Sequence, residues 1–264
     1  MPEGDTILRS AVTLHARLAG RKVLRWQSTI PAIARAKIVG HTIERVDAVG
    51  KNLFIVFDDK RSLHTHMRMT GSWHVYPQNL DPRKLPGSAR VLIEVDGCTA
   101  VCFSAPTIRL LSDAEVDREV RTLGPDILAP GFDAGEAASG LVARGERPIG
   151  EVVMDQTVIA GIGNIYKSES LYIARIDPFA STEALGVERV RTLLAHARRI
   201  MQRNLASGSS MRTTRIGAGG RLWVYKRSSE PCFTCGDRIR MLRQGMQKRS
   251  TYYCHTCQKV ALAK

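Results

Sequence analysis

Residues 232–257 read CFTCGDRIRMLRQGMQKRSTYYCHTC, and their cysteines predict the fold of the C-terminal part of this 264-residue chain. Cys232 and Cys235 form one C-x2-C pair, Cys254 and Cys257 form a second, and eighteen residues separate the pairs. This spacing matches the four-thiolate template of structural zinc. The intervening residues are polar, which argues against core thiols, and disulfides are rare in a reducing compartment. We therefore predict a structural zinc ion that stabilises a hairpin too small to build its own core.

The positive charge of the chain is concentrated around this hairpin. The sequence has 39 Lys plus Arg against 25 Asp plus Glu, which gives a net charge of +14. Residues 212–264 carry twelve of the bases and two acids, so they supply +10 of that excess. Such an excess favours a polyanionic partner, because it otherwise costs self-repulsion. A solvated basic surface is the alternative interpretation of a charge run alone.

The apolar pattern divides the rest of the chain into a β-rich part and a helical part. Apolar residues at helical spacing predict a helix over 5–18, with Gly20 at its end. Short apolar runs and alternations over 22–101 predict strands. Ser112 opens a capping box, and the sequence then reads helical to about residue 205.

Composition limits the class of protein. With 44% hydrophobic and 24% charged residues, the chain has the composition of a soluble globular protein. It contains no apolar segment of the roughly 18 residues that a membrane span needs. The first residues carry acids where a secretory signal carries bases, so we expect a cytoplasmic protein. Cys98 and Cys102 lie in an apolar run and are expected to be buried thiols without a role.

Two glycines lie between helical stretches in residues 156–166, which read QTVIAGIGNIY. Gly161 and Gly163 allow close backbone approach, and the N–H groups of a following helix would point at an anion. Asn164 would add a side-chain donor. A tight helix–helix turn explains the same residues equally well. No strand precedes the turn and no further glycine follows it, which excludes a dinucleotide-binding site.

The chain begins with a possible amine nucleophile. Removal of Met1 before the small Pro2 would expose a secondary α-amine, which condenses with an aldehyde to a cationic iminium and so forms an electron sink. An α-amine with a pKa of about 7.7–8.0 is roughly a tenth neutral at pH 7, far more than a lysine at about 10.4. Glu3 could act beside it as a general acid or base. By itself this start is common among ordinary chains.

Taken together, five motifs resemble the formamidopyrimidine-DNA glycosylase and endonuclease VIII family in kind and in order. They are MPEGDT at 1–6, GKNL at 50–53, LGPD at 123–126, AGIGNIY at 160–166 and the four-cysteine finger. The resemblance spans essentially the whole chain. It implies an α+β fold with an N-terminal β-sandwich catalytic domain and flanking helices at 1–111, a helical domain with a helix-two-turn-helix at 112–220, and a β-hairpin zinc finger at 221–264.

The resemblance also implies roles for individual residues. Pro2 would attack C1′ of a damaged nucleotide, and Glu3 would assist base loss and opening of the sugar ring. Lys51 would contact the phosphate and the lesion and help proton transfer; a solvated turn residue is the alternative. Asn164 would bind phosphate, and Arg249 would hold the phosphates that flank the lesion.

A loop and a missing motif bear on the subfamily. Arg68 and Met69 resemble the loop that the family inserts where a base has been extruded, although Met69 could instead be a core residue. Residues 102–108 lack the Arg-x-Phe wedge that is typical of the formamidopyrimidine branch. The start of the chain and RLWVY at 221–225 resemble endonuclease VIII-like enzymes, particularly those of actinobacteria.

We therefore expect a bifunctional DNA glycosylase and AP lyase that excises oxidised pyrimidines from damaged double-stranded DNA. It would act through a Schiff base on Pro2, followed by β,δ-elimination, as a monomer. A preference for oxidised purines is the alternative within the family. A DNA-binding protein without catalysis is a different class, against which only Pro2 and Glu3 argue. The size and the basic finger exclude an N-terminal-proline tautomerase.

Overall fold

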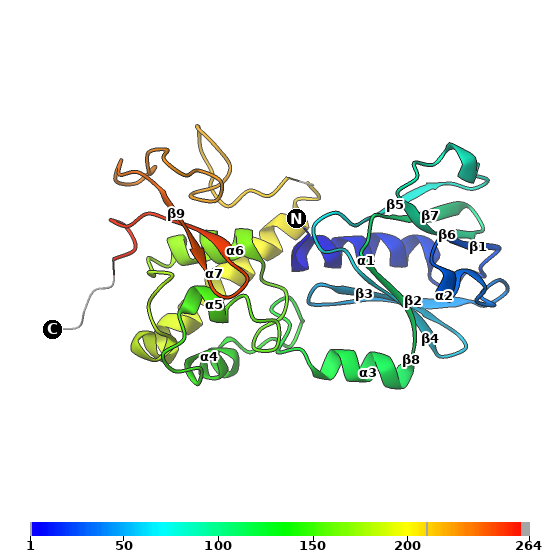
Figure 1. Cartoon of the computed structure of the whole chain (residues 1–264), viewed down its shortest axis with the longest axis horizontal. Coiled ribbons are helices and arrows are strands. Elements are labelled where there is room, and N and C mark those ends of the chain that lie inside the picture. The colour runs from blue at the N-terminus through cyan, green and yellow to red at the C-terminus, as the bar shows by residue number, and fades with distance from the viewer. Residues whose placement is uncertain (1, 210, 260–264) are drawn as a thin grey trace. The chain divides into compact units, whose positions relative to one another are not determined.

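The computed structural model describes residues 2–209 and 211–259 (Figure 1). Met1, whose removal the sequence predicts, and Ser210 lie outside the described residues. The chain divides into two compact units, residues 1–122 and 123–264. The boundary expected between residues 220 and 221 falls inside the second unit, so the helices and the hairpin are described together below.

The first unit begins with the predicted helix, α1, at Gly4–Leu18. It buries an apolar stripe of Ile7, Ala11, Leu14 and Leu18. Gly20 adopts φ +76° just after the helix, a conformation that favours glycine. The prediction of a helix close to the N-terminus is therefore confirmed.

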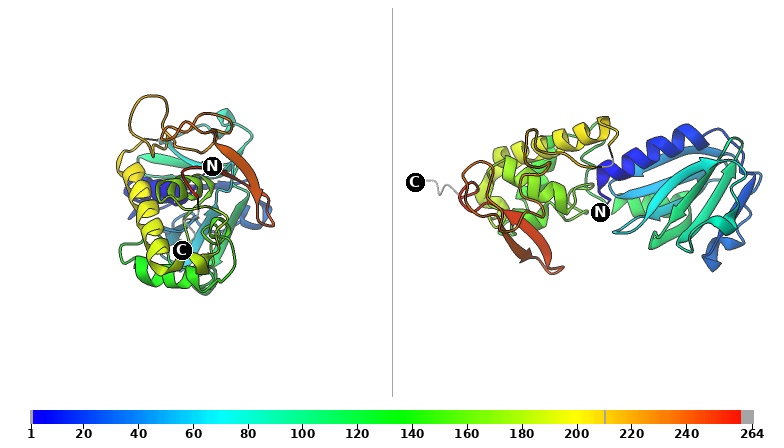
Figure 2. Two further views of the ribbon diagram at one scale, coloured as in Figure 1. Left: turned by 90° about the vertical axis from the view of Figure 1, so that its left-hand side faces the viewer. Right: turned by 90° about the horizontal axis from the view of Figure 1, so that it is seen from above.

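Two antiparallel four-stranded sheets follow, in agreement with the predicted β-rich part (Figure 2). The first has the order β1-β6-β7-β5 and comprises β1 (Arg25–Ser28), β6 (Ala89–Val95), β7 (Cys98–Phe103) and β5 (Ser72–Pro77). The second has the order β2-β3-β4-β8 and comprises β2 (Ile43–Val49), β3 (Asn52–Phe57), β4 (Arg61–His66) and β8 (Thr107–Ser112). Both sheets and α1 contribute to one core, in which Cys98 and Cys102 are buried. The expected β-sandwich is confirmed.

Three short helical elements complete the first unit: α2 (Pro31–Ala34), the 3-10 helix η1 (Pro82–Lys84) and α3 (Asp113–Arg121). The predicted capping box is present, because Glu115 accepts the Ser112 N–H and hydroxyl at 2.8 Å each. Val116 and Val120 of α3 pack against Phe54 and Leu111 of the second sheet. For this reason α3 belongs to the first unit rather than to the helical domain expected from residue 112 onward.

The second unit is helical up to residue 206 and ends in the hairpin. Its helices are α4 (Ala134–Val142), α5 (Ile149–Val152), α6 (Asn164–Ile173) and α7 (Thr182–Ala206), and its strands are β9 (Arg240–Gln244) and β10 (Arg249–Tyr253). The helices share a core that includes Tyr166, Leu171 and Leu194. A smaller core of Tyr172, Val224, Cys232, Ile239 and Cys254 joins α6 to the hairpin.

Within the β-hairpin finger expected at 221–264, the described residues form strands only at β9 and β10. Residues 221–239 form turns with an isolated bridge between Pro231 and Arg238. Among the described residues, no helix is long and apolar enough to cross a membrane.

Candidate functional site

Pro2 and Glu3 lie at the start of α1. Pro2 is half-buried, and Glu3 is 1% exposed. The backbone of Glu3 is extended, and its carbonyl accepts the N–H groups of Thr6 and Ile7 at 2.9 and 3.1 Å, so Glu3 is the N-cap of the helix. The positive end of a helix dipole stabilises a carboxylate. The local fold therefore fixes an acid directly beside the predicted nucleophile.

Lys51 lies in the two-residue turn that joins β2 to β3, next to Gly50. Val49 and Asn52 pair at the ends of the strands, which leaves Gly50 and Lys51 in the turn. Gly50 adopts φ +60°, which suits this kind of hairpin. Lys51 is half-buried, and its role beside a lesion stays a prediction.

His66 is a candidate residue that the sequence did not reveal. It lies opposite Asn52 on β4, beside the turn that contains Lys51. Burial lowers the pKa of His66, and the charges of Arg68 and Lys51 lower it further. Its Nδ1 accepts the Arg68 N–H at 3.1 Å. The structure thus places the charges of Lys51 and Arg68 around the imidazole of His66, which stays neutral near pH 7. Only the pairing of β3 with β4 could have identified His66 as a neighbour of the Lys51 turn.

The loop after β4 exposes Met69. Met67 is 1% exposed and belongs to the core, whereas Met69 is 61% exposed. Arg68 between them adopts φ +47° and is exposed. Gly71 closes the loop by donating its N–H to the Met67 carbonyl at 2.8 Å, and a Cβ there would lie 2.7 Å from Met67 Cα. Met69 is therefore not a core residue, which excludes that alternative.

In the second unit, the Gly-x-Gly turn leads into α6 as the sequence suggests. Gly161 adopts φ +103°, and its N–H donates to Gln156 Oε1 at 3.1 Å. Gln156 Nε2 donates to the Ile162 carbonyl at 3.1 Å and so holds the turn from inside. Gly163 is the N-cap of α6. The motif is thus a helix–helix turn that also presents a helix N-terminus, and anion binding at that terminus stays a prediction.

Asn164 and Arg249 are brought together through Ser250. Asn164 is 3% exposed, and its Nδ2 donates to the Ser250 carbonyl at 2.8 Å and to Ser250 Oγ at 3.1 Å. The donor that the sequence assigned to a phosphate is thus occupied by the hairpin. Among the described residues, Asn164 Oδ1 has no hydrogen-bond partner. Gln247 Oε1 accepts Arg249 Nε and Nη2 at 3.1 and 2.9 Å, which orients the guanidinium at the start of β10.

Two buried charged side chains on α6 were not predicted. Lys167 is 1% exposed, and its Nζ donates to the Ser250 carbonyl at 3.2 Å and to Thr251 Oγ1 at 2.8 Å. The run Lys167-Ser168-Glu169-Ser170 reads as an exposed polar stretch of a helix, so no sequence signal indicated that these groups are buried.

Glu169 is the second of these side chains and is fully buried. Its carboxylate accepts the N–H groups of Trp223, Val224 and Tyr225 at 2.8–2.9 Å and the hydroxyl of Thr214. Burial raises the pKa of Glu169, and these hydrogen bonds act in the opposite direction. Glu169 therefore joins α6 to the two chain segments that flank residues 215–222.

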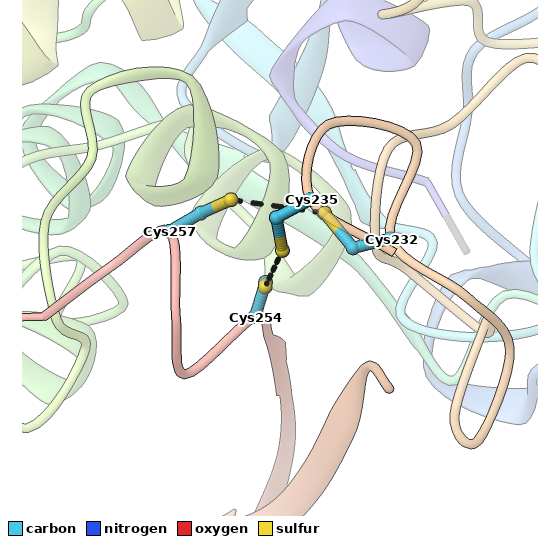
Figure 3. Close-up of side chains that lie close together, drawn as sticks. All are labelled: Cys232, Cys235, Cys254 and Cys257. Carbon is cyan, nitrogen blue, oxygen red and sulfur yellow. Dashed lines mark hydrogen bonds between the residues drawn. The ribbon is translucent and has the colours of Figure 1, made fainter. Parts of the chain in front are cut away.

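The four predicted cysteines converge in the second unit (Figure 3). Their sulfur atoms all lie within 4.8 Å of one another; Cys232 and Cys257 are 3.8 Å apart, and Cys235 and Cys254 are 3.5 Å apart. Four thiolates bound tetrahedrally at about 2.3 Å from zinc would be separated by about 3.8 Å. The donor set and its geometry therefore fit a closed tetrahedral metal site.

Helix α6 also reaches this cluster. The hydroxyl of Tyr172 lies 3.1 Å from Cys232 Sγ and 2.7 Å from Thr234 Oγ1. Burial alone would raise the pKa of the Cys232 thiol, but hydrogen bonds from Tyr172 and from the backbone lower it to about 6. The thiolate form is thus favoured at Cys232, whereas burial raises the pKa of the Cys254 and Cys257 thiols.

Comparisons with known proteins agree with this arrangement. Residues 1–107 match the model of the formamidopyrimidine-DNA glycosylase N-terminal domain, and residues 123–215 match that of the formamidopyrimidine-DNA glycosylase H2TH domain. A Streptomyces coelicolor relative named probable endonuclease 8 2 is 36% identical over 263 residues, which cover 98% of this chain and 94% of the relative. The DNA-(apurinic or apyrimidinic site) lyase Nei2 of Mycolicibacterium smegmatis is 31% identical over 258 residues, with 98% and 99% covered. The formamidopyrimidine-DNA glycosylase of Lactococcus lactis, solved with DNA that contains an AP site, has the same fold, with a TM-score of 0.83, 23% identity, and 98% and 100% of the chains covered.

Proposed function

The chain belongs to the formamidopyrimidine-DNA glycosylase family and is a DNA glycosylase and AP lyase of base excision repair, and we propose that it excises oxidised pyrimidines. The observation that carries the catalytic part of this proposal is the start of the chain. The family match begins at residue 1, where Pro2 is followed by the buried N-cap acid Glu3.

The choice of oxidised pyrimidines rests on two observations. The 36% identical relative is named an endonuclease 8. Residues 102–108, which read CFSAPTI, lack the Arg-x-Phe pair of the formamidopyrimidine branch.

The proposed reaction runs through the amine of Pro2. Once Met1 is removed, the Pro2 nitrogen attacks C1′ of an extruded nucleotide, the bond from C1′ to the base breaks, and the base leaves with a proton. Glu3 carries protons for base loss and ring opening. Loss of the acidified C2′ proton from the resulting iminium breaks the bond to the 3′ phosphate, and a second elimination breaks the bond to the 5′ phosphate. Lys51, beside the neutral His66, contacts the phosphate and assists proton transfer.

The other proposed roles concern the grip on damaged double-stranded DNA. Arg249, oriented by Gln247, binds phosphate together with the N-terminus of α6 at Asn164. Arg68 and Met69 lie on the exposed loop after β4, and Met69 fills the space left by the extruded base. The four cysteines hold a structural zinc ion, which supplies no step of the reaction because four protein ligands leave no open position. We further propose that the protein acts as a monomer in the bacterial cytoplasm, on the DNA of the nucleoid.

Borohydride trapping tests the nucleophile. Native protein, Pro2→Gly and a form that retains Met1 are incubated with a duplex that contains an abasic site, in the presence of borohydride. We expect a covalent adduct with the native protein and far less with the other two. A fully active preparation whose Met1 is still attached, as shown by mass spectrometry, would overturn the proposed chemistry.

Paired substrates test the lesion. Single-turnover excision is measured on duplexes that contain thymine glycol or 8-oxoguanine in the same sequence. We expect faster excision of thymine glycol. Faster excision of 8-oxoguanine would assign the chain to oxidised purines, and DNA binding without any excision or trapping would make it a binding protein only.

A further inference from the structure

The tip of the β9–β10 hairpin exposes a single apolar side chain. Met246 is 101% exposed, and no large hydrophobic side chain among the described residues is more exposed. The turn is closed by the Lys248 N–H, which donates to the Gly245 carbonyl at 2.9 Å, and Gly245 adopts φ +71°. Figure 2 shows the hairpin projecting from the helices of the second unit.

The strand ends that flank the tip are fixed, so the tip is a preformed projection. Gln244, the last residue of β9, is 6% exposed, and its Nε2 donates to the Pro178 carbonyl at 2.9 Å. Thr251 Oγ1 donates to Gln244 Oε1 at 2.9 Å and lies 2.8 Å from Lys167 Nζ. Binding through the tip therefore needs little ordering of the hairpin itself.

The hairpin sequence around Met246 is strongly basic, and one acid, Glu151 of α5, lies beside the neighbouring Gly245. Residues 238–249 contain Arg238, Arg240, Arg243, Lys248 and Arg249 and no acid. An apolar partner surface would provide no counter-charge for these cations. Duplex DNA provides both counter-charge and apolar contact, because phosphates line a groove whose floor consists of base edges and stacked steps.

We propose that Met246 inserts into a groove of duplex DNA and packs against the bases there, while Arg249 binds a neighbouring phosphate. The unbranched, adaptable thioether suits such an irregular apolar surface. This inference rests on the proposed function only in that the partner is DNA. It assigns the apolar contact to a residue that takes no part in the reaction and lies on a different unit from Met69.

The test separates an apolar contact from a phosphate contact. Dissociation constants of native protein, Met246→Ala, Met246→Leu and Arg249→Gln are measured against salt on a duplex with a tetrahydrofuran abasic analogue. Val39→Ala, a truncation of a 59% exposed side chain in the first unit, is the matched control. We expect Met246→Ala to bind about five- to tenfold more weakly with an unchanged salt slope, because the side chain touches no phosphate. Met246→Leu should bind like native protein, and Arg249→Gln should lower the slope by about one.

A base-stacking probe gives a second, independent readout. 2-Aminopurine is placed at successive steps of the duplex, and its fluorescence should rise at one step on binding of native protein but not of Met246→Ala. Native affinity and native fluorescence for Met246→Ala would overturn the proposal, as would a reduced salt slope for this variant. Borohydride trapping of the same preparations keeps the two proposals apart: trapping by native protein together with normal binding by Met246→Ala rejects the insertion alone.

Discussion

Among single residues of the second unit, Glu169 joins several chain segments through its carboxylate. It accepts three backbone N–H groups and the Thr214 hydroxyl in a site without exposure to water. Donors that lose such a partner stay buried and unsatisfied, which costs more than the net gain of an ordinary hydrogen bond.

Glu169→Gln should therefore destabilise the protein by about 3 kcal/mol, because an amide NH2 would face backbone donors. The measurement is the free energy of unfolding in urea. Glu188→Gln is the control, since Glu188 pairs with Arg191 at the surface and exposed pairs contribute about 0–1 kcal/mol. Equal effects of the two variants would contradict the assigned role of Glu169.

His64 predicts how stability depends on pH. Burial lowers the pKa of His64 from 6.5 to about 4; Arg109 and His66 lower it as well, while Glu119 raises it. The unfolded chain therefore binds a proton between these values that the folded chain does not. The stability that the neutral imidazole contributes is present above about pH 6.5 and is lost as the pH falls toward about 4.

The measurement is the urea midpoint of native protein and His64→Gln at several values between pH 7 and pH 4. Glutamine does not titrate and can still bond to Asn52, whose Oδ1 lies 2.9 Å from His64 Nε2. We expect the native midpoint to fall further than that of the variant. Parallel curves would show that another group is responsible.

For single residues, the sequence predicted which side chains could form a site, but not which of their atoms already form hydrogen bonds within the protein. The spacing identified the four cysteines, and the structure places their sulfur atoms together. It also singled out Asn164, yet the partner of its amide is Ser250, which lies 86 residues away in the chain. Lys167 and Glu169 resemble exposed helix charges in the sequence, because only the folded hairpin and the turn at 223–225 bury them.

At the scale of helices and strands, local sequence patterns were enough to predict several elements. Helix α1, the strands of the sandwich and the capping box of α3 follow from apolar spacing and from local hydrogen bonding, which act over a few residues. Residues 222–225 form a short apolar run, LWVY, but lie in turns, because Glu169 holds the N–H groups of 223–225 that a strand would need for pairing. A contact made 54 residues away in the chain thus overrides the local pattern.

Replacement of two glycines of the second unit by alanine should change the stability of the protein in opposite directions. A Cβ at Gly124, in the turn between α3 and α4, would lie 2.3 Å from the backbone carbon of Val158, so Gly124→Ala should destabilise this turn by about 2 kcal/mol or more. Gly140 is exposed inside α4 with nothing within 4 Å, so Gly140→Ala should stabilise the protein by about 0.5–1 kcal/mol. Thermal and urea unfolding of both variants are the measurements. A neutral Gly124→Ala would mean that the turn relaxes freely.

For the molecule as a whole, we expect the metal to stabilise the structure of the second unit only. The three tryptophans report on this separately: Trp26 and Trp73 lie in the core of the first unit, and Trp223 packs beside the cysteine cluster. The core of the first unit contains none of the four ligands.

Removal of zinc should release about one ion per chain and change the emission of Trp223 alone. The measurement combines a chelator with a zinc-sensitive dye and tryptophan fluorescence. Trp223→Phe is the control: its remaining emission should not respond to the chelator, and its DNA binding should still be lost with the metal. A response of Trp26 and Trp73 would show that the two units unfold together.

The Ser250 carbonyl makes the contact between α6 and the hairpin insensitive to the side chain at position 250. This one main-chain oxygen accepts both Asn164 Nδ2 and Lys167 Nζ, so the joint between α6 and the hairpin centres on an atom that every amino acid possesses. Substitution of Ser250 can remove the contact of its Oγ with Asn164, but it leaves the main-chain carbonyl that accepts Asn164 and Lys167. Only an ester in place of the following amide, which weakens the carbonyl as an acceptor, would reveal how strongly the two parts depend on it.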